Sequence, residues 1–511
     1  MQQESRVKKS LLNARVNLIF YFLTLALSFF SRKIFLDGLG ADFIGLTGTL
    51  GNLLGFLNLA ESGVSGAIAV VLYKFLFEHN EEKIKDVVSV LGYLYNTIGK
   101  VILGGGLLLA CFFPLIFPDS ELGLSIIYLT FFSFLGSSLI GYFINYKQVL
   151  LSADQRNYVV AAYSQSANVV KILLQMVLVY NTGNYYLWVI VEFSFGILYS
   201  IILNWKIRKV YPWLVTEVAK GKALCKEYPD VMKYTKQLFV HKIGSVAYIQ
   251  VTPFLVYAFA SLQAVAYYGN YTMITTKLST LLANFLGGTS ASVGNLIAEG
   301  NKDKILKVYW ELMSIRLLFT SVAVFAMYHL LPPFISLWLG EEYVMSKALL
   351  ILVLISFALS IIRGVTEEFL FGYSLFNDVW GPFAEAIILI IVAIAGGYLW
   401  GLEGTLLGAI VSTIIIIYIW KPYFLFKKGF KMPVWRYWKE LLKYLLMISF
   451  AFYLSMVLLK MLSLDLAIYN NWIDWILYAI IIVLLFMFVV TPLLLITTEG
   501  TKNLCCRFIK L

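Results

Sequence analysis

Charged residues are scarce in this 511-residue chain, where Asp, Glu, Lys and Arg together make up 14% of the sequence. Cysteine and histidine are rarer still, with four and three residues. The cysteines show no framework spacing, which argues against a disulfide role, and the histidines have no carboxylate cluster beside them that would make a zinc site. The chain also lacks a phosphate-binding loop with its lysine, so no ATPase domain is expected.

Hydrophobic residues are abundant instead. They make up 60% of the chain, aromatic residues make up 16%, and the mean hydropathy is +0.82, far above that of a soluble globular protein. The apolar runs are long enough to cross the hydrocarbon core as helices, at about 20 residues for about 30 Å, and they do not alternate as barrel strands would. The sequence therefore predicts an all-α polytopic membrane protein of about fourteen spans, which begin near residues 13, 43, 86, 123, 157, 186, 237, 266, 305, 346, 379, 402, 441 and 473.

The distribution of Lys and Arg predicts the orientation of these spans. Of the 40 basic residues, 31 fall in segments on one side of the predicted spans, whereas six connections on the other side contain none. By the positive-inside rule, both termini would be cytoplasmic and the basic N-terminus would lead into an uncleaved first span. The net charge of +11 then reflects topology and anionic lipid headgroups, and we expect no nucleic-acid partner.

The chain is weakly similar to itself. Polar residues in span 1 recur in span 7 at the same steps, displaced by 224 residues, and "NEEKI" at 80–84 matches "NKDKI" at 301–305. Parallel repeats of this kind build transporters whose site lies between the halves. The predicted organisation is an N-terminal six-helix bundle at 1–205, a basic cytoplasmic linker at 206–236, a C-terminal six-helix bundle at 237–430, and two further helices with a cytoplasmic tail at 431–511.

The repeated polar residues keep to one face of each helix, because steps of three and four return to the same side. Such a face must meet protein or water, so we expect either hydrogen bonds between helices or a polar cavity. The candidate cavity-lining residues are Asn17, Tyr21, Thr24, Ser28, Asn168, His241, Ser245 and Tyr248.

Several cations lie within the predicted spans and are candidate substrate-binding residues. They are Arg32, Lys33, Lys171, Lys277 and Arg363. A charge inside the membrane demands a partner or a function. For Arg32 and Lys33 the alternative is that both side chains snorkel to the outer interface, and for Arg363 the favoured alternative is an ion pair with Glu367 one helical turn away.

Three acidic residues within the spans, Glu61, Glu192 and Glu385, have two interpretations. Each is either a counter-ion to one of the cations or a site where a proton or Na⁺ couples to transport. The sequence leaves both open, and apart from such an ion we expect no cofactor and no metal.

Four features together resemble a known superfamily. They are the exit from span 1, "SRKIFLDGLGADFIGL" (31–46), the run "ESGVSGAIA" (61–69), the "NEEKI" elbow, and fourteen spans arranged as six, six and two. The pattern is similar to the multidrug/oligosaccharidyl-lipid/polysaccharide (MOP) exporters, in particular to the O-antigen and capsule repeat-unit flippases of the polysaccharide transporter family. The resemblance implies two bundles in a V, alternating access, a lipid-tail groove near the last two spans, and a cationic lumen for which Arg32, Lys171 and Lys277 are suitably placed.

The resulting expectation is a bacterial inner-membrane flippase and not an enzyme. It would move a polyprenyl-pyrophosphate-linked oligosaccharide across the membrane, with membrane lipid and polysaccharide assembly proteins as partners. One alternative is a multidrug or small-molecule cation antiporter of the same fold, which would favour an acidic chamber. A polysaccharide polymerase or ligase is the other, although it would be expected to show a large outer loop with catalytic Arg or His.

Overall fold

The structure is a computed structural model that describes residues 6–61, 63–118, 121–286, 290–373, 375, 378, 380–462 and 471–509. Every regular element within these ranges is a helix, which confirms the all-α prediction. The chain forms two compact units. Unit 1 comprises Met1–Tyr257 and Ser261–Ala266, and unit 2 comprises Ala258–Ala260 and Tyr267–Leu511.

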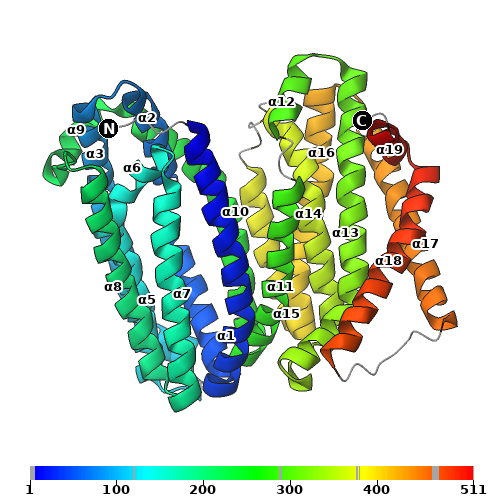
Figure 1. Ribbon diagram of the computed structural model, residues 1–511, viewed down its shortest axis with the longest axis horizontal. Helices are drawn as coiled ribbons and strands as arrows, with labels where there is room; N and C mark the ends of the chain where they lie inside the picture. Colours follow the sequence, from blue (N-terminus) through cyan, green and yellow to red (C-terminus); the bar gives the residue numbers. More distant parts are fainter. Residues whose placement is uncertain are drawn as a thin grey trace. The chain divides into compact units, whose positions relative to one another are not determined.

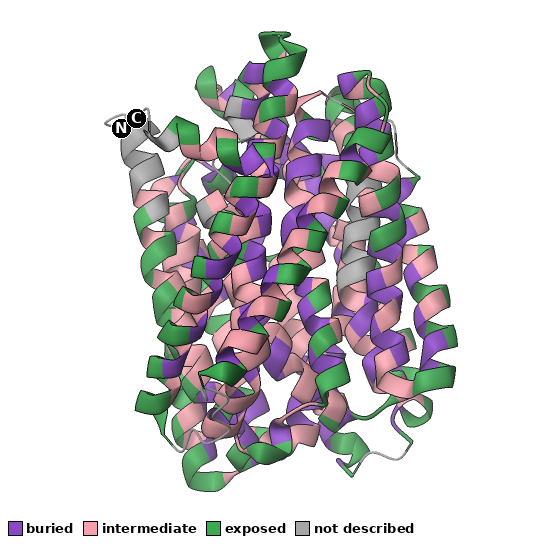
Figure 2. Ribbon diagram, turned by 90° about the vertical axis from the view of Figure 1, so that its right-hand side faces the viewer, coloured by how far each residue is buried: buried purple, intermediate pink, exposed green. Residues whose placement is uncertain are grey.

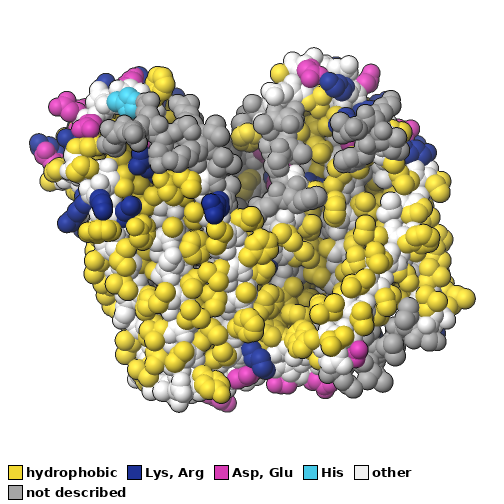
Figure 3. Space-filling view, in the orientation of Figure 1, with side chains coloured by type: hydrophobic (Ala, Val, Ile, Leu, Met, Phe, Trp, Pro, Cys, Tyr) yellow, Lys and Arg dark blue, Asp and Glu magenta, His cyan; other side chains and the backbone are white. Residues whose placement is uncertain are grey.

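Unit 1 is a bundle of long helices, in which α1 packs against α7, α7 against α8, and α8 against α5 (Figure 1). Its helices are α1 (Arg6–Leu57), α2 (Val64–Phe77), α3 (Glu81–Cys111), α4 (Phe113–Ile116), α5 (Leu124–Phe143), α6 (Gln148–Ala153), α7 (Asn157–Thr182), α8 (Tyr185–Val210), α9 (Gly221–Glu227) and most of α10 (Pro229–Phe259). Hydrophobic side chains cover the flank of this unit in Figure 3, and most of its visible Lys and Arg lie toward the end that carries α3 and α9. This surface is the one expected of a bundle surrounded by lipid.

Unit 2 is a second helical bundle. Its helices are α11 (Leu262–Leu286) from Tyr267 onward, α12 (Ser290–Ala298), α13 (Lys302–Trp338), α14 (Lys347–Gly372), α15 (Gly381–Thr413), α16 (Lys421–Phe424), α17 (Trp435–Met461), α18 (Trp472–Thr497) and α19 (Glu499–Ile509). Helix α13 packs against α14, α18 and α19, and its buried Tyr309 meets the rings of Phe369 and Phe430 at centroid distances of 5.1 and 5.5 Å. Figure 2 shows buried and exposed residues following one another along the helices.

Two helices start with the same capping interaction, one in each unit. The Asn80 side chain accepts a hydrogen bond from the Lys83 backbone N–H at 3.1 Å, and Asn301 accepts one from Lys304 at 3.1 Å. An asparagine in this position satisfies one of the free N–H groups at a helix start. These caps belong to the two copies of the repeated "N-x-x-K-I" motif, so the repeat has the same local structure in both units.

A kink at Gly40 divides α1 into two arms. Gly40 has φ 77°, a left-handed conformation that glycine adopts without the strain of a side chain. Five residues further on, Gly45 lies so close to the α11 start that a Cβ there would sit 1.9 Å from the Leu262 carbonyl oxygen. Glycine is therefore required at both positions, first for the turn and then for the close approach.

A second kink and two π-helical segments shape the chain from Gly381 to Phe430. Helix α15 bends at Gly401, which has φ 58°, and continues into π-helical Ile414–Trp420, short α16 and π-helical Leu425–Phe430. π-Helical turns are rare and often occur at functional sites. Here they change the direction of the side chains that follow.

The kinks account for the number of membrane passes. Nine helices of the described chain are long and apolar enough to span a membrane, and two of them, of 43 and 50 residues, would each extend about twice the hydrocarbon thickness if they were straight. Counting these two as double passes gives eleven, and α7, α10 and α11, of 26, 31 and 25 residues, are long enough to bring the number within the described residues to the predicted fourteen. They begin close to the predicted positions, so the predicted fold class is confirmed.

Candidate functional site

Arg32 and Lys33 lie inside the first arm of α1, before the kink at Gly40. The Arg32 side chain is half-buried, and its Nη2 donates a 2.8 Å hydrogen bond to the Ala266 carbonyl oxygen at the start of α11. Lys33 is exposed and its Nζ lies 3.5 Å from a carboxylate oxygen of Asp37, one turn along the helix. The Arg32 contact joins α1 to α11 within unit 1 and holds the guanidinium in one position.

Lys171 pairs with Glu192 across α7 and α8. Its Nζ lies 2.6 Å from Glu192 Oε1, and the amide of buried Gln175 donates to Glu192 Oε2 at 3.0 Å and to the Trp188 carbonyl oxygen at 3.2 Å. Both charged side chains are mostly buried, with 17% and 22% exposed. Of the two interpretations of Glu192, the structure supports the counter-ion, and the pair carries no net charge.

Glu61 has a different environment, made of tyrosine hydroxyls. Tyr95 and Tyr142 each donate a hydrogen bond to its carboxylate, the latter at 3.0 Å, and Tyr142 also bonds to the Asn58 side chain at 3.0 Å. Among the residues that the structure describes, Glu61 forms no ion pair. A membrane-embedded carboxylate held by hydroxyl donors can accept a proton or a small cation without first losing a lysine or arginine partner.

A four-residue charge network lies in unit 2. Arg363 Nη2 is 2.8 Å from Glu367 Oε1, as predicted from their spacing along α14, and Lys421 Nζ reaches the same oxygen at 3.1 Å. Arg363 also lies 3.9 Å from Glu385, whose carboxylate accepts a 3.5 Å hydrogen bond from Thr413. Two positive and two negative charges therefore balance within this network.

The remaining candidates are spread over several helices. Asn17 is exposed on α1, whereas Tyr21, Thr24, Ser28 and Asn168 are half-buried. The hydroxyls of Thr24 and Ser28 donate to carbonyl oxygens of their own helix at 2.7 Å, so these bonds do not link helices.

The other four candidates lie on α10 and α11. Lys277 is half-buried on α11 in unit 2. His241, Ser245 and Tyr248 fall in α10, and their side chains lie outside the described residues.

Sequence reasoning missed the residues whose partners lie on other helices. Lys421 counted as part of a cytoplasmic segment, although the apolar run "IIIIYIW" before it and "PYFLF" after it indicates a continuous helix. A second ion pair, between Arg316 and Glu368, also crosses from α13 to α14 beside this network. Tyr95 and Tyr142 gave no signal of their own, because tyrosine is common in this chain.

Comparison with known proteins finds a similar arrangement of helices in solved structures of transporters. No protein-family profile matches the chain, and no curated protein does. Among solved structures, the lipid II flippase MurJ in an inward closed conformation is similar with a TM-score of 0.64 and 17% identity, over 92% of this chain and 98% of that chain. An inward-facing multidrug resistance MATE family transporter of the MOP superfamily is similar with a TM-score of 0.60 and 15% identity, over 81% of this chain and 95% of that chain. The chain is a multi-pass membrane protein with the fold shared by these transporters.

Proposed function

We propose that the protein is a flippase that moves a polyprenyl-pyrophosphate-linked oligosaccharide repeat unit across the bacterial inner membrane by alternating access. In this proposal both termini are cytoplasmic, as the Lys and Arg distribution favours. The observation that carries it is the extent of the similarity to a lipid II flippase. The similarity to that structure covers 92% of this chain. The unmatched part is too short to contain both α17 and α18, which have 27 and 26 residues, so the similarity extends into the last two membrane helices.

The charges of the described residues support an anionic cargo over a cationic one. The carboxylates of Glu192, Glu367 and Glu385 all lie beside Lys or Arg, so they are already neutralised. A cation antiporter would need such acids to be available to its cargo. A diphosphate, in contrast, can exchange places with a carboxylate on Lys or Arg, since both ligands offer oxygen acceptors in similar geometry.

Glu61 supports a coupling role in the same proposal. Among the described residues its carboxylate contacts tyrosine hydroxyls and no Lys or Arg, so in this proposal a proton or Na⁺ moving down its gradient binds there while the cargo binds elsewhere. Lys171 and Arg32 are proposed to contact the anionic headgroup, the former after exchanging Glu192 for phosphate.

The experiment that tests the proposal follows a fluorescent lipid-linked oligosaccharide across the bilayer of proteoliposomes containing the full chain. We expect Arg32→Ala to slow transfer about tenfold or more, as loss of a charge-assisted hydrogen bond would, and Arg32→Lys to retain part of it. Lys100→Ala, which removes an exposed lysine of α3, is the matched control for charge. Arg32 also donates a hydrogen bond to the Ala266 carbonyl oxygen, so its loss could slow transfer by destabilising the fold. The yield and melting temperature of each Arg32 variant must therefore equal those of the unchanged chain.

A multidrug cation antiporter is the second candidate, favoured by the TM-score of 0.60 to the MATE family transporter. The same proteoliposomes distinguish the two functions. Gradient-driven uptake of ethidium without transfer of the lipid-linked sugar would replace the flippase proposal with the antiporter. Transfer of the sugar in a protein that ignores ethidium would support the flippase.

A further inference from the structure

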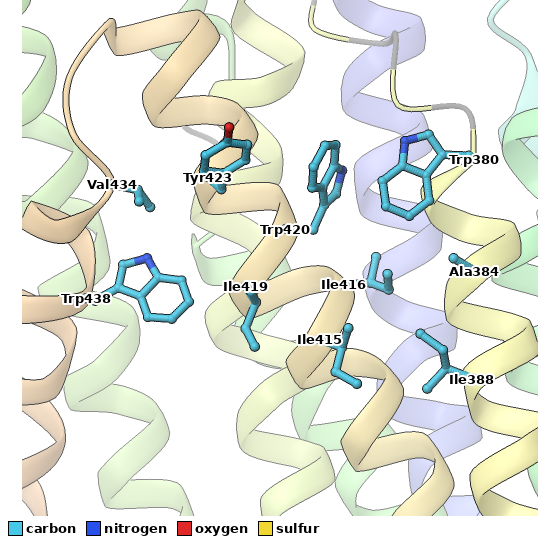
Figure 4. Close-up of a pocket in the computed structure, with 10 residues that line it drawn as sticks. All are labelled: Trp380, Ala384, Ile388, Ile415, Ile416, Ile419, Trp420, Tyr423, Val434 and Trp438. Atoms are coloured by element: carbon cyan, nitrogen blue, oxygen red, sulfur yellow. The ribbon is translucent and has the colours of Figure 1, made fainter.

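Unit 2 contains an apolar groove that none of the functional proposals uses. It has a volume of about 460 Å³, within the range of sites for small molecules. Its walls come from α15, the π-helical segment Ile414–Trp420, α16 and the start of α17 (Figure 4). Among the described residues no charged side chain belongs to the lining, which includes three tryptophans, a tyrosine and four isoleucines. Several lining side chains are partly exposed, among them Trp380 at 48% and Ile419 at 43%, so the groove is open along one side.

The groove changes character along its length. In Figure 4 the rings of Trp380, Trp420 and Tyr423 lie in the upper part, and the isoleucines lie below them. The indole N–H groups of Trp420 and Trp438 are buried and have no hydrogen-bond partner among the described residues. Because the described lining exposes no polar atom, these N–H groups are not accessible from the groove, and the tryptophan rings present only apolar surface to an occupant.

Positive charge lies at the aromatic end. The Lys427 ammonium donates a 2.6 Å hydrogen bond to the Tyr423 hydroxyl and lies 5.0 Å from the centre of that ring, which forms part of the groove wall. The surrounding segment, 421–443, carries seven Lys and Arg against one acid, Glu440. An occupant that reaches this end therefore meets a cation.

We propose that the groove binds one anionic phospholipid of the surrounding membrane. An acyl chain lies along the isoleucines and the apolar faces of the tryptophan rings, and the phosphate contacts Lys427 beside Tyr423. The apolar tail of the lipid thus lies in the apolar part of the groove, and its charged headgroup lies at the end where Lys427 is. Trp and Tyr occupy the headgroup level of membrane proteins for the same reason, since one edge of each ring is polar and the rest is apolar.

The groove is separate from the charge network of Arg363, Glu367, Lys421 and Glu385, none of which lines it. Binding there does not depend on the flippase proposal, so either can fail without the other. A water-soluble cofactor is disfavoured because such a ligand needs several polar groups to orient it, and the described lining exposes no polar atom.

The test uses the full chain, purified and delipidated in detergent, and native mass spectrometry with phosphatidylglycerol and phosphatidylcholine of identical acyl chains. We expect one phosphatidylglycerol to be retained in preference to phosphatidylcholine. Lys427→Gln is expected to reduce that preference about fivefold, the contribution of one lysine to anionic-lipid binding, and Lys428→Gln, the same charge change at the next residue, to reduce it far less. Ile415→Ala and Ile419→Ala shorten partly exposed side chains of the groove wall, so they should weaken retention of both lipids with little change in melting temperature.

Three outcomes would overturn the proposal. Equal retention of phosphatidylglycerol and phosphatidylcholine would show that the groove does not recognise an anionic headgroup. Equal losses from Lys427→Gln and Lys428→Gln would reduce the effect to general surface charge. Displacement of phosphatidylglycerol by equimolar polyprenyl phosphate would assign the groove to the tail of a transported lipid instead.

Discussion

The charge network of unit 2 makes a quantitative prediction about stability. Glu367 accepts contacts from Arg363 and Lys421, so Glu367→Gln leaves two positive charges facing Glu385 alone. Breaking a buried pair by removing one partner costs about 3–5 kcal/mol, and because 36% of the Glu367 side chain is exposed we expect a smaller loss, about 2–3 kcal/mol. For a unit of this size that corresponds to a fall of about 4–12 °C in melting temperature.

A double-mutant cycle separates the ion pair from other effects of the substitution. Lys421→Met removes one of the two cations, and the double variant Glu367→Gln/Lys421→Met leaves Arg363 and Glu385 balanced. We therefore expect the double variant to be less destabilised than the sum of the single variants, with a coupling energy of about 1–3 kcal/mol.

The assay is the apparent melting temperature of the purified full chain in one detergent at one scan rate, because membrane proteins of this size commonly unfold irreversibly. Glu341→Gln, in the exposed connection before α14, is the matched control and should change the melting temperature by less than about 1 °C. Additive single effects, or a Glu367→Gln variant that melts like the control, would refute the idea that the four charges act as one network.

Three further predictions concern unit 1. Glu61→Gln should abolish the dependence of transport on an imposed proton or Na⁺ gradient in proteoliposomes, whereas Glu78→Gln should not, and a gradient-dependent Glu61→Gln protein would exclude the coupling role. Gly45→Ala should destabilise the protein by about 1–3 kcal/mol, because its Cβ would overlap the Leu262 carbonyl; Gly51→Ala in the same arm of α1, where nothing lies within 4 Å, is the control in the same melting assay. Burial raises the pKa of the Cys225 thiol. Near pH 8 the fraction of reactive thiolate is therefore lower in the folded protein than in the unfolded protein, and this fraction increases as the pH rises through the raised pKa. Alkylation of a variant retaining only Cys225 should therefore be slower in the folded protein than in SDS, by a factor that shrinks between pH 8 and pH 10, and equal rates would contradict this.

The sequence was sufficient for the helices themselves. A segment that crosses lipid must satisfy its backbone hydrogen bonds internally, so each apolar run of suitable length encodes a helix without information about its neighbours. The start of α14, predicted near residue 346, is Lys347, and that of α18, predicted near 473, is Trp472. The Arg363–Glu367 pair was predictable for the same reason, because both residues belong to one helix and four positions along α14 bring them to the same face.

Interactions between helices depended on tertiary structure. Lys171 and Glu192 are 21 residues apart and Lys421 and Glu367 are 54 apart, and no periodicity in the sequence relates them. The same holds for the two tyrosines that bind Glu61 and for the groove between α15 and α17, where a π-helical turn rotates Trp420 beside Trp380. Local hydropathy and spacing thus determined which segments became helices and how each one is patterned, whereas the choice of charge partners and the shape of the apolar groove were decided by packing, since side chains meet across helices only where the kinks and crossings bring their faces together.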